Sequence, residues 1–293
     1  MSAVIRRGLS RRNFLAGVGC TAGAAAVAAT GCGGSSKVTT PTPNPTITDA
    51  DVLNFALNLE YLEAEFYLRA ATGTGLANSD IGSSAGAVTG GAQVPFKTQA
   101  IQQYAMEIAD DEQAHVQFLR KALGTSAVAR PAINFTDAFN AAASAAGIGP
   151  AFNPFADEES FLLGAFVFED VGVTAYHGAA GLLSSVANLQ AAAAIMAVEA
   201  YHAGEIRTLI AQTGGSAVTY ANKISALRGA AGGGGETSVS TGTIVAADSD
   251  SIAYDRTTDQ VLHIVYLNAT AGSVSKGGFF PNGLNGTITS SAS

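Results

Sequence analysis

The chain has 293 residues, of which 47% are hydrophobic and only 13% are charged, and its formal net charge is −8. This length provides enough apolar material for one substantial core and a smaller appendage. The excess of acidic residues argues against nucleic acid as a partner and against electrostatic binding to a membrane surface.

The first 32 residues carry the features of an export signal. Residues 10–15 are Ser-Arg-Arg-Asn-Phe-Leu, which fits the twin-arginine pattern, and an apolar run without charge follows. The run ends in a sequence similar to a lipobox, with Cys32 as the residue to be lipidated, although Ala29 stands where that pattern prefers Leu. Lipidation of Cys32 and plain cleavage in the same region both stay open. We expect the mature chain to be periplasmic or a membrane-anchored lipoprotein that contacts a membrane only through that lipid.

Both cysteines of the chain, Cys20 and Cys32, lie in or beside this signal. The mature domain is therefore predicted to have no disulfide and no thiolate metal ligand. Residues 33–48 follow as a flexible tether, because Gly, Ser, Thr and Pro predominate there and cannot bury a core.

A first long helix is predicted to begin at an N-cap residue near position 48. Its apolar residues cover two sides, which indicates a helix that is buried on both. Glu60 and Glu63 share one face with Tyr67, whereas Glu65 points away and is expected to be solvated. Residues 71–95 then form an insertion that is longer than a bundle turn needs, and we expect it to cover one end of the bundle.

The second long helix is predicted over residues 95–123, with Glu112 and His115 on its apolar inner face. Spacing of i and i+3 projects both side chains from the same side of a helix. Burying an isolated ion there would cost roughly several kcal/mol, which favours a metal-ligand role for Glu112. Asp111, directly before it, is a candidate acceptor for the outer N–H of a ligand histidine.

Residues 124–157 form a long link with a short helix predicted over 136–146. The third long helix then places Glu169 at the centre of an apolar run, while the neighbouring Asp170 points elsewhere. For His177, eight residues beyond Glu169, a structural role is favoured over a role as an additional ligand.

The fourth long helix is predicted over residues 188–213, and two glycines end it. Glu199 and His202 face inward and repeat the spacing of Glu112 and His115. Glu205 is interpreted as an outer acid that pairs with Arg207 or with a neighbouring helix.

The chain order is therefore Glu, Glu-x-x-His, Glu, Glu-x-x-His. Over roughly residues 50–212 this order resembles the ferritin-like carboxylate proteins, in which two helices supply one Glu each and two supply Glu-x-x-His. The resemblance implies an all-α four-helix bundle with a long crossover, over residues 49–215. In that family a Tyr commonly follows the ligand of the first helix by seven residues, which favours Glu60 with Tyr67. Glu63 is then either the alternative ligand or a residue that contacts the ligands from outside.

The resemblance also implies a dinuclear metal centre. Its proposed ligands are Glu60, Glu112, His115, Glu169, Glu199 and His202. Glu112 and Glu199 would bridge two ions, with Glu60 and His115 completing one coordination sphere and Glu169 and His202 the other. Carboxylates with imidazoles suit two Fe or two Mn ions, and the sequence does not choose between them.

Two classes of function follow from this centre and its family. The first is a di-metal oxidoreductase that acts on dioxygen or peroxide, either as a ferrous iron oxidase or as an enzyme similar to manganese catalase. The second is a non-catalytic stress or desiccation protein that uses the same bundle for binding. Cage-type iron storage is a weaker alternative, because the tether, the insertion and the C-terminal appendage would obstruct a closed shell.

Residues 216–293 are predicted to be a small irregular appendage. It begins with a flexible Gly-rich joint over 230–235, includes a short helix over 258–267, and ends with the run Gly-Gly-Phe-Phe-Pro-Asn-Gly-Leu-Asn-Gly over 277–286. Next to a ferritin-like domain, this run is similar to that of exported proteins related to plant desiccation-associated proteins. His263 is interpreted as a packing or surface residue.

Overall fold

The computed structural model describes residues 47–292 of the chain. The predicted signal peptide, lipobox and most of the tether lie outside the described residues. The described elements are α2 (Asp49–Thr72), α3 (Asn78–Ile81), β1 (Val88–Thr89), α4 (Gln99–Leu123), a 3-10 turn (Gly124–Ser126), β2 (Ile133–Asn134), α5 (Phe135–Ala145), α6 (Glu158–Ala180), α7 (Val186–Thr213), α8 (Gly215–Ala231) and α9 (Thr258–Val265). Within this part of the chain, no helix is both long and apolar enough to cross a membrane.

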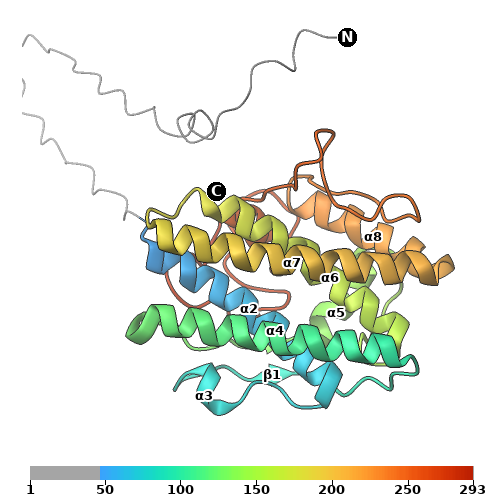
Figure 1. Ribbon diagram of the computed structural model, residues 1–293, viewed down its shortest axis with the longest axis horizontal. Helices are drawn as coiled ribbons and strands as arrows, with labels where there is room; N and C mark the ends of the chain where they lie inside the picture. Colours follow the sequence, from blue (N-terminus) through green and yellow to red (C-terminus); the bar gives the residue numbers. More distant parts are fainter. Residues whose placement is uncertain (1–46, 293) are drawn as a thin grey trace, which may run out of the picture. The chain divides into compact units, whose positions relative to one another are not determined.

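The four longest helices form a bundle built from two pairs. Helix α2 packs along α4, helix α6 packs along α7, and α2 and α6 contact each other between the pairs. In Figure 1, α4 and α7 run lengthwise and α2 is seen between them. The long link that carries α5 connects the two pairs. The all-α bundle with a long crossover that the sequence predicts is therefore confirmed.

Polar side chains explain where the long helices begin. Thr48 and Asp51 form a capping box at the start of α2, in which each side chain accepts the backbone N–H of the other residue. Asp157 and Ser185 accept backbone N–H groups at the starts of α6 and α7. Between α7 and α8 stands Gly214 with a φ of 71°, a conformation that glycine adopts without strain. The chain can therefore turn sharply there.

The insertion after α2 lies along α4, on the side away from α7 (Figure 1). Its α3 residue Asp80 accepts hydrogen bonds from Gln113 and Gln117 of α4. Its strand β1 pairs in parallel with β2 of the long link. The insertion thus covers a side of the second helix, and the short helix predicted within the link is present as α5, one residue from its predicted bounds.

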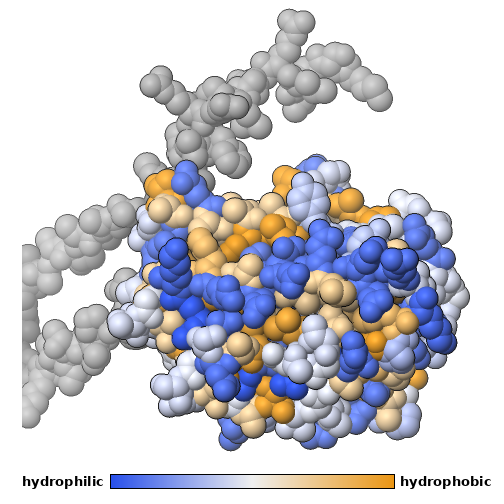
Figure 2. All heavy atoms as spheres, turned by 60° about the horizontal axis from the view of Figure 1, so that its bottom comes forward, coloured by the Kyte–Doolittle hydropathy of each residue, from blue (hydrophilic) through white to orange (hydrophobic). Residues whose placement is uncertain are grey.

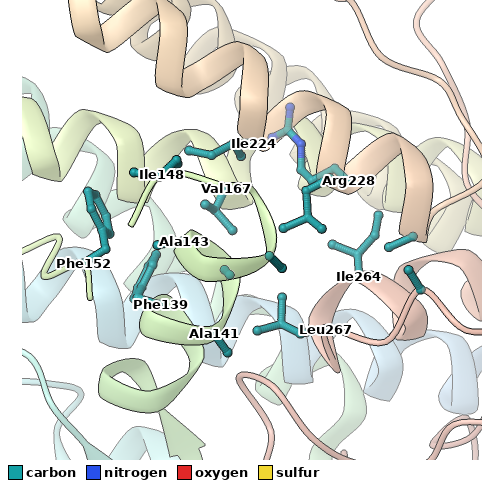
Figure 3. A pocket seen from close by; sticks show the side chains of 15 residues that line it. Phe139, Ala141, Ala143, Ile148, Phe152, Val167, Ile224, Arg228, Ile264 and Leu267 are labelled. Carbon is teal, nitrogen blue, oxygen red and sulfur yellow. The ribbon is translucent and has the colours of Figure 1, made fainter. Parts of the chain in front are cut away.

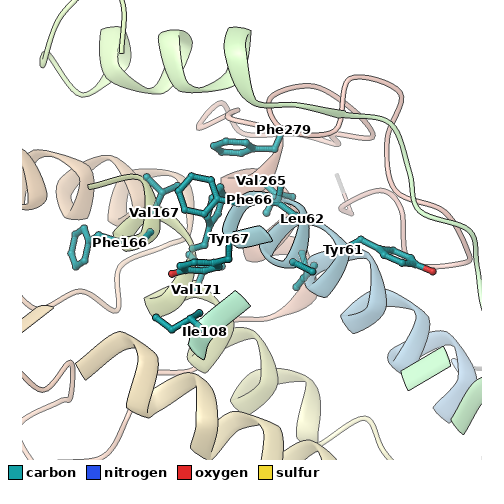
Figure 4. Close-up of a cluster of buried hydrophobic side chains, with 14 of the residues drawn as sticks. Tyr61, Leu62, Phe66, Tyr67, Ile108, Phe166, Val167, Val171, Val265 and Phe279 are labelled. Atoms are coloured by element: carbon teal, nitrogen blue, oxygen red, sulfur yellow. The ribbon is translucent and has the colours of Figure 1, made fainter. Parts of the chain in front are cut away.

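Aromatic rings fill the core between α2, α5 and α6. The ring of Phe66 lies 5.2–5.9 Å, between centroids, from those of Tyr67, Phe135, Phe139, Phe155, Phe161 and Phe168. Phe279, from the C-terminal region, packs against Phe139 and Phe168 at 5.1 and 5.0 Å. Figure 4 shows Phe279 above Phe66 and Tyr67, with Ile108 of α4 on the opposite side. The C-terminal region is therefore part of the core.

The C-terminal region is more regular than the sequence suggested. Residues 215–231 form the helix α8, for which no element was predicted, and α9 occupies most of the predicted short helix. The Gly-rich segment that was expected to be a flexible joint is held by hydrogen bonds, because the carbonyls of Gly234 and Gly235 accept from Arg256. In the terminal run, Asn285 exchanges two hydrogen bonds with Asn58 of α2.

A buried ionic network joins this region to the bundle. Asp170 of α6 accepts from Arg207 of α7 at 2.8 Å and from Arg228 of α8 at 2.7 Å. Glu236 pairs with Arg228 at 2.8 Å and with Arg256 at 2.7 Å. Asp170 thus points away from the interior of the bundle, as predicted. Arg207 forms its ion pair with Asp170 and not with Glu205. The predicted pairing of Glu205 with Arg207 is therefore wrong.

Glu65 departs from its predicted exposure. Its side chain is fully buried and accepts hydrogen bonds from Arg69, one turn later, and from Arg130 of the long link. The expectation that Glu65 is solvated is therefore wrong. A guanidinium from a distant segment compensates its charge, and helical spacing alone cannot indicate such a partner.

Figure 2 shows one face of the molecule, on which hydrophilic residues predominate and hydrophobic patches are small and scattered. Large apolar side chains that reach the surface include Met106, Phe118 and Tyr201. Single exposed apolar residues are common on soluble folds. Ionisable side chains that are buried are therefore the more informative feature.

Candidate metal centre

Six ionisable side chains meet inside the bundle, and they are the six that the sequence singled out. They form two groups in which the ligand atoms lie within 4.8 Å of one another: Glu60, Glu112, His115 and Glu199 in one, and Glu112, Glu169, Glu199 and His202 in the other. Glu112 and Glu199 belong to both groups. We call the six residues the carboxylate centre, and the groups the His115 position and the His202 position.

The local sequence explains this convergence. Helices α2 and α6 are buried nearly all round, so Glu60 and Glu169 at their middles face the interior. Helices α4 and α7 each have one exposed side, and the i, i+3 spacing directs both members of each Glu-x-x-His away from it. All four carboxylates of the centre are at most 1% exposed.

The centre contains polar atoms that protein atoms leave without hydrogen bonds. Among the described residues, the unpartnered buried atoms of the centre are Glu60 Oε2, Glu112 Oε1, Glu169 Oε2, both carboxylate oxygens of Glu199, and His202 Nδ1. His202 Nδ1 lies 3.0 Å from Glu112 Oε1, but without the orientation of a hydrogen bond. Buried polar atoms normally have partners, so the donor set fits bound cations.

Both imidazoles present the Nδ1 atom to the carboxylates. Nδ1 of His115 lies 3.2 Å from Glu60, 3.3 Å from Glu112 and 3.6 Å from Glu199. Nδ1 of His202 lies 3.5 Å from Glu169, and its Nε2 lies 3.1 Å from Asp111 Oδ2. The predicted role of Asp111 as an acceptor for a histidine of the centre is therefore confirmed.

Two tyrosines hold the outer carboxylates in a crossed arrangement. Tyr67 of α2 donates to Glu169 of α6, and Tyr176 of α6 donates to Glu60 of α2. Burial and the adjacent Glu169 raise the pKa of Tyr67 well above its usual value, so its hydroxyl stays protonated as the donor. Tyr176 was not predicted, although it follows Glu169 by the same seven residues that separate Tyr67 from Glu60.

A seventh carboxylate borders the centre. Glu63 is 5% exposed. A Cβ atom added at Gly172 would overlap Glu199 Oε2 and would lie 3.4 Å from Glu63 Oε1. Glu199 therefore occupies the space that the absence of a side chain at Gly172 leaves open, and Glu63 lies beside it. Glu63 is thus adjacent to the centre but belongs to neither of the two groups of ligand atoms.

Burial or the crowded charges raise the pKa values of Glu60, Glu199 and His115. Burial, followed by repulsion from Glu112, raises the pKa of Glu60 to about 7. Burial likewise raises the pKa of Glu199 well above its usual range, with Glu112 and Glu63 adding to the effect. Burial opposes the charged form of His115, but contacts with Glu112 and Glu60 raise its pKa to about 10. The metal-free centre therefore holds protons that bound cations would displace.

The remaining histidines lie outside the centre. His177 Nδ1 faces the backbone carbonyl of Tyr254 at 3.1 Å, which agrees with a structural role. His263 Nδ1 lies 2.6 Å from the carbonyl of Asn268 within the C-terminal region. Neither residue belongs to the two groups of ligand atoms.

A separate cavity of about 160 Å³ lies between α5, α6, α8 and α9 (Figure 3). Its lining is apolar apart from Arg228, and the guanidinium of Arg228 is engaged with Asp170 and Glu236. The cavity contains no carboxylate and no histidine. The chemistry of the described chain is therefore concentrated at the carboxylate centre and not at this cavity.

Comparison with known proteins agrees with this geometry. The chain is 30% identical over 269 residues to the ferritin-like catalase Nec2 of Nesocodon mauritianus, a match that covers 82% of this chain and 84% of the relative. It is also 30% identical over 245 residues to the desiccation-related protein PCC13-62 of Craterostigma plantagineum, covering 73% and 76% of the two chains. The sequence profile of the ferritin-like domain matches residues 48–212, which include the whole carboxylate centre. The chain belongs to the ferritin-like family.

Proposed function

We propose that this protein binds two Fe or two Mn ions at the carboxylate centre and consumes hydrogen peroxide. The observation that carries the proposal is the set of unpartnered, buried oxygen and nitrogen atoms that face one another in two groups. The similarity to a relative named as a ferritin-like catalase supports peroxide as the substrate. Oxidation of ferrous iron is the other reaction that such a donor set supports.

The ligand assignment follows the two groups. Glu112 and Glu199 would be shared by both ions, since each belongs to the His115 position and to the His202 position. Glu60 and His115 would complete one position, and Glu169 and His202 the other. A donor set of four carboxylates and two imidazoles without sulfur suits Fe or Mn. A bound pair of such ions would supply the two-electron redox chemistry that one ion alone does not supply.

The side chains around the centre have definable tasks in this proposal. Tyr67 and Tyr176 fix the orientation of Glu169 and Glu60 by donating hydrogen bonds. The fully buried rings of the core next to Tyr67 exclude bulk water from that side. Glu63 lies against the centre with a pKa that burial, and then repulsion from Glu112, raise well above the usual range, which favours its protonated form.

The test is metal content followed by a peroxide assay. Protein produced without residues 1–32, with both Fe and Mn supplied, is expected to contain about two metal ions per chain. Metal-loaded protein is then expected to release dioxygen from hydrogen peroxide, measured with an oxygen electrode. Folded protein that takes up neither metal would contradict the proposed centre. If metal-loaded protein does not consume peroxide but oxidises added ferrous iron, the function is iron oxidation.

A non-catalytic stress role is the second candidate, and the similarity to a desiccation-related protein favours it. Replacing both Glu112 and Glu199 by Gln distinguishes the two functions, because it removes the shared ligands while nearly preserving side-chain volume. If the variant still protects cells during drying as the unmodified protein does, the protective role does not need the metals.

We also propose export by the twin-arginine route, with the protein acting in the periplasm or anchored through Cys32. The basis is the sequence of residues 10–15 and the apolar run after it. Replacing Arg11 and Arg12 by Lys is expected to keep the protein in the cytoplasm, as measured by cell fractionation. Export that persists in this variant would contradict the assignment of the signal.

A further inference from the structure

The two Glu-x-x-His segments differ in the residue that precedes the glutamate. Asp111 precedes Glu112, whereas Val198 stands at the matching place before Glu199. Asp111 reaches from α4 to α7, and its Oδ2 atom lies 3.1 Å from Nε2 of His202. Val198 has no polar atom with which to serve His115 in return. Of the two histidines in the duplicated pattern, only His202 therefore has a carboxylate partner for its outer nitrogen, Nε2.

The outer nitrogen of His115 has no partner in the part of the chain that the structure describes. Within the described residues, the polar contacts of His115 are made by Nδ1, toward Glu60, Glu112 and Glu199. Its side chain is 11% exposed, compared with 5% for His202. Nε2 of His115 is thus left to solvent, and Nε2 of His202 is held by protein.

We propose, building on the function proposed above, that the two metal positions are unequal: the His202 position binds its ion more tightly, and the His115 position holds the ion that exchanges first. The residue that sets the difference is Asp111, which acts through His202 and touches neither metal. It is a positioning residue for one half of the centre.

The physical basis is the second hydrogen bond of a ligand histidine. A carboxylate that accepts the outer N–H fixes the tautomer that leaves Nδ1 free to bind metal, holds the ring in place and makes the imidazole a better donor. Losing such a partner typically lowers metal affinity by about 10–100-fold. The Asp111 side chain is 45% exposed, so its effect is screened by water, and we expect the lower end of that range.

The experiment isolates each position with a histidine variant and titrates it with Mn²⁺ alone. His115→Ala should leave the His202 position, and His202→Ala should leave the His115 position, each binding about one ion. The His202 position is expected to bind about tenfold more tightly, by calorimetry and by the rate of ion loss to a chelator. Equal affinities and equal loss rates in the two variants would overturn the inference.

Asp111 and its counterpart then provide matched variants. Asp111→Ala in the His115→Ala background is expected to weaken binding about tenfold, while Asp111→Asn, which keeps an acceptor, should restore part of the loss. Val198→Asp in the His202→Ala background should tighten binding. If Asp111→Ala instead weakens the His115 position as much as the His202 position, the residue has a general structural role and the inference fails.

The outcome also separates this inference from the function on which it rests. Unmodified protein that binds neither Mn²⁺ nor Fe²⁺ would overturn the dinuclear centre itself, and the inequality with it; if only Fe²⁺ binds, the same titrations are made with Fe²⁺ under exclusion of dioxygen. Protein that binds about two ions with the same affinity and the same loss rate would leave the centre intact and overturn only the inequality. Thermal unfolding of each variant, followed by circular dichroism, checks that the comparison is made between folded proteins.

Discussion

The bundle consists of two halves that carry the same ligand pattern with different neighbours. The first half, α2 with α4, supplies Glu60, Glu112 and His115, and the second half, α6 with α7, supplies the equivalent residues. Yet Glu63, three residues after Glu60, corresponds to Gly172, three residues after Glu169. The comparison shows that the ligands and tyrosines are repeated, whereas the residues that adjust charge and space around them are not.

The absence of a side chain at Gly172 makes room for Glu199. Glu63 and Glu199 approach each other next to Gly172, where a methyl group would already overlap Glu199. A second glutamate at the position of Gly172 would have no room, because its Cβ atom could not be placed without moving Glu199. The glycine is therefore required by Glu199, whereas Glu63 Oε1 would lie at an ordinary contact distance of 3.4 Å from the added Cβ atom.

The largest effect is expected from the residues that belong to both halves of the centre. Glu112→Gln or Glu199→Gln should reduce metal content from about two ions per chain to nearly none, because each carboxylate is shared by both positions. Elemental analysis of the purified variants measures this. Glu205→Gln is the matched control, since Glu205 lies on α7 outside the centre, and it should retain both ions. Full metal content in Glu112→Gln would contradict the shared role.

A smaller effect should follow from residues that belong to one position. Glu60→Gln is expected to cost the ion at the His115 position and Glu169→Gln the ion at the His202 position, leaving about one ion per chain in each variant. Elemental analysis again provides the measurement, with the double variant as a reference for complete loss. If either single variant loses both ions, the two positions do not fill independently.

Tyr67 and Tyr176, which donate hydrogen bonds across the two halves, should contribute equally to the stability of the fold. Tyr67→Phe and Tyr176→Phe each remove a buried hydrogen bond to a carboxylate, which is expected to lower the free energy of unfolding by about 1.5–3 kcal/mol. Denaturant unfolding of the metal-free protein tests this. Tyr201→Phe on the exposed side of α7 should leave stability unchanged. An effect in only one of the buried variants would mean that the halves are not equivalent in this respect.

The last effect concerns pH and involves Glu60 together with both histidines. In the metal-free fold, Glu60 has a pKa raised from 4.5 to about 7, so its ionisation destabilises the fold as pH rises between these values. The pKa values of His115 and His202 are raised from 6.5 to about 10 and about 12, because their carboxylate neighbours outweigh burial. Their stabilisation is complete below pH 6.5 and is lost as pH rises towards the folded values.

Glu60 and the two histidines therefore all lower the stability of the metal-free fold as pH rises. Bound metal ions would take the place of the protons. The melting temperature of metal-free protein should therefore fall from about pH 5 to about pH 8, while that of metal-loaded protein should fall less. Each kcal/mol of difference corresponds to about 2–4 °C for a domain of this size. Scanning calorimetry of both forms across this range gives the answer. If the difference between the melting temperatures of metal-loaded and metal-free protein becomes smaller as pH rises, the assignment of protons to the centre is contradicted.

The six residues of the carboxylate centre were accessible from the sequence because their signal is local. Glu112 with His115, and Glu199 with His202, share a helical face by spacing alone, and Glu60 and Glu169 lie in apolar runs where a carboxylate is unusual. Tyr176 had an equally local signal, in the seven residues that separate it from Glu169. The bundle and its order could therefore be predicted with the site.

What could not be predicted depends on partners far away in the chain. Glu65 is buried because Arg130 reaches it from another segment, and no periodicity in α2 indicates that contact. Helix α8 is rich in Ala, Gly and Ser, with little separation of polar and apolar faces, so its sequence resembles a linker. The place of Glu199 likewise depends on Gly172, which lies on a different helix.

The ionic network around Asp170 has a consequence for where this protein can be divided. The family profile ends at residue 212, but two of the three guanidinium groups in the network, Arg228 and Arg256, come after that point. A chain shortened to end after α7 would leave Asp170 with Arg207 alone and would uncover the α6 surface on which α8 and α9 pack. The autonomous folding unit is thus larger than the family domain, and experiments on isolated bundles of this protein should keep the chain through its last described residues.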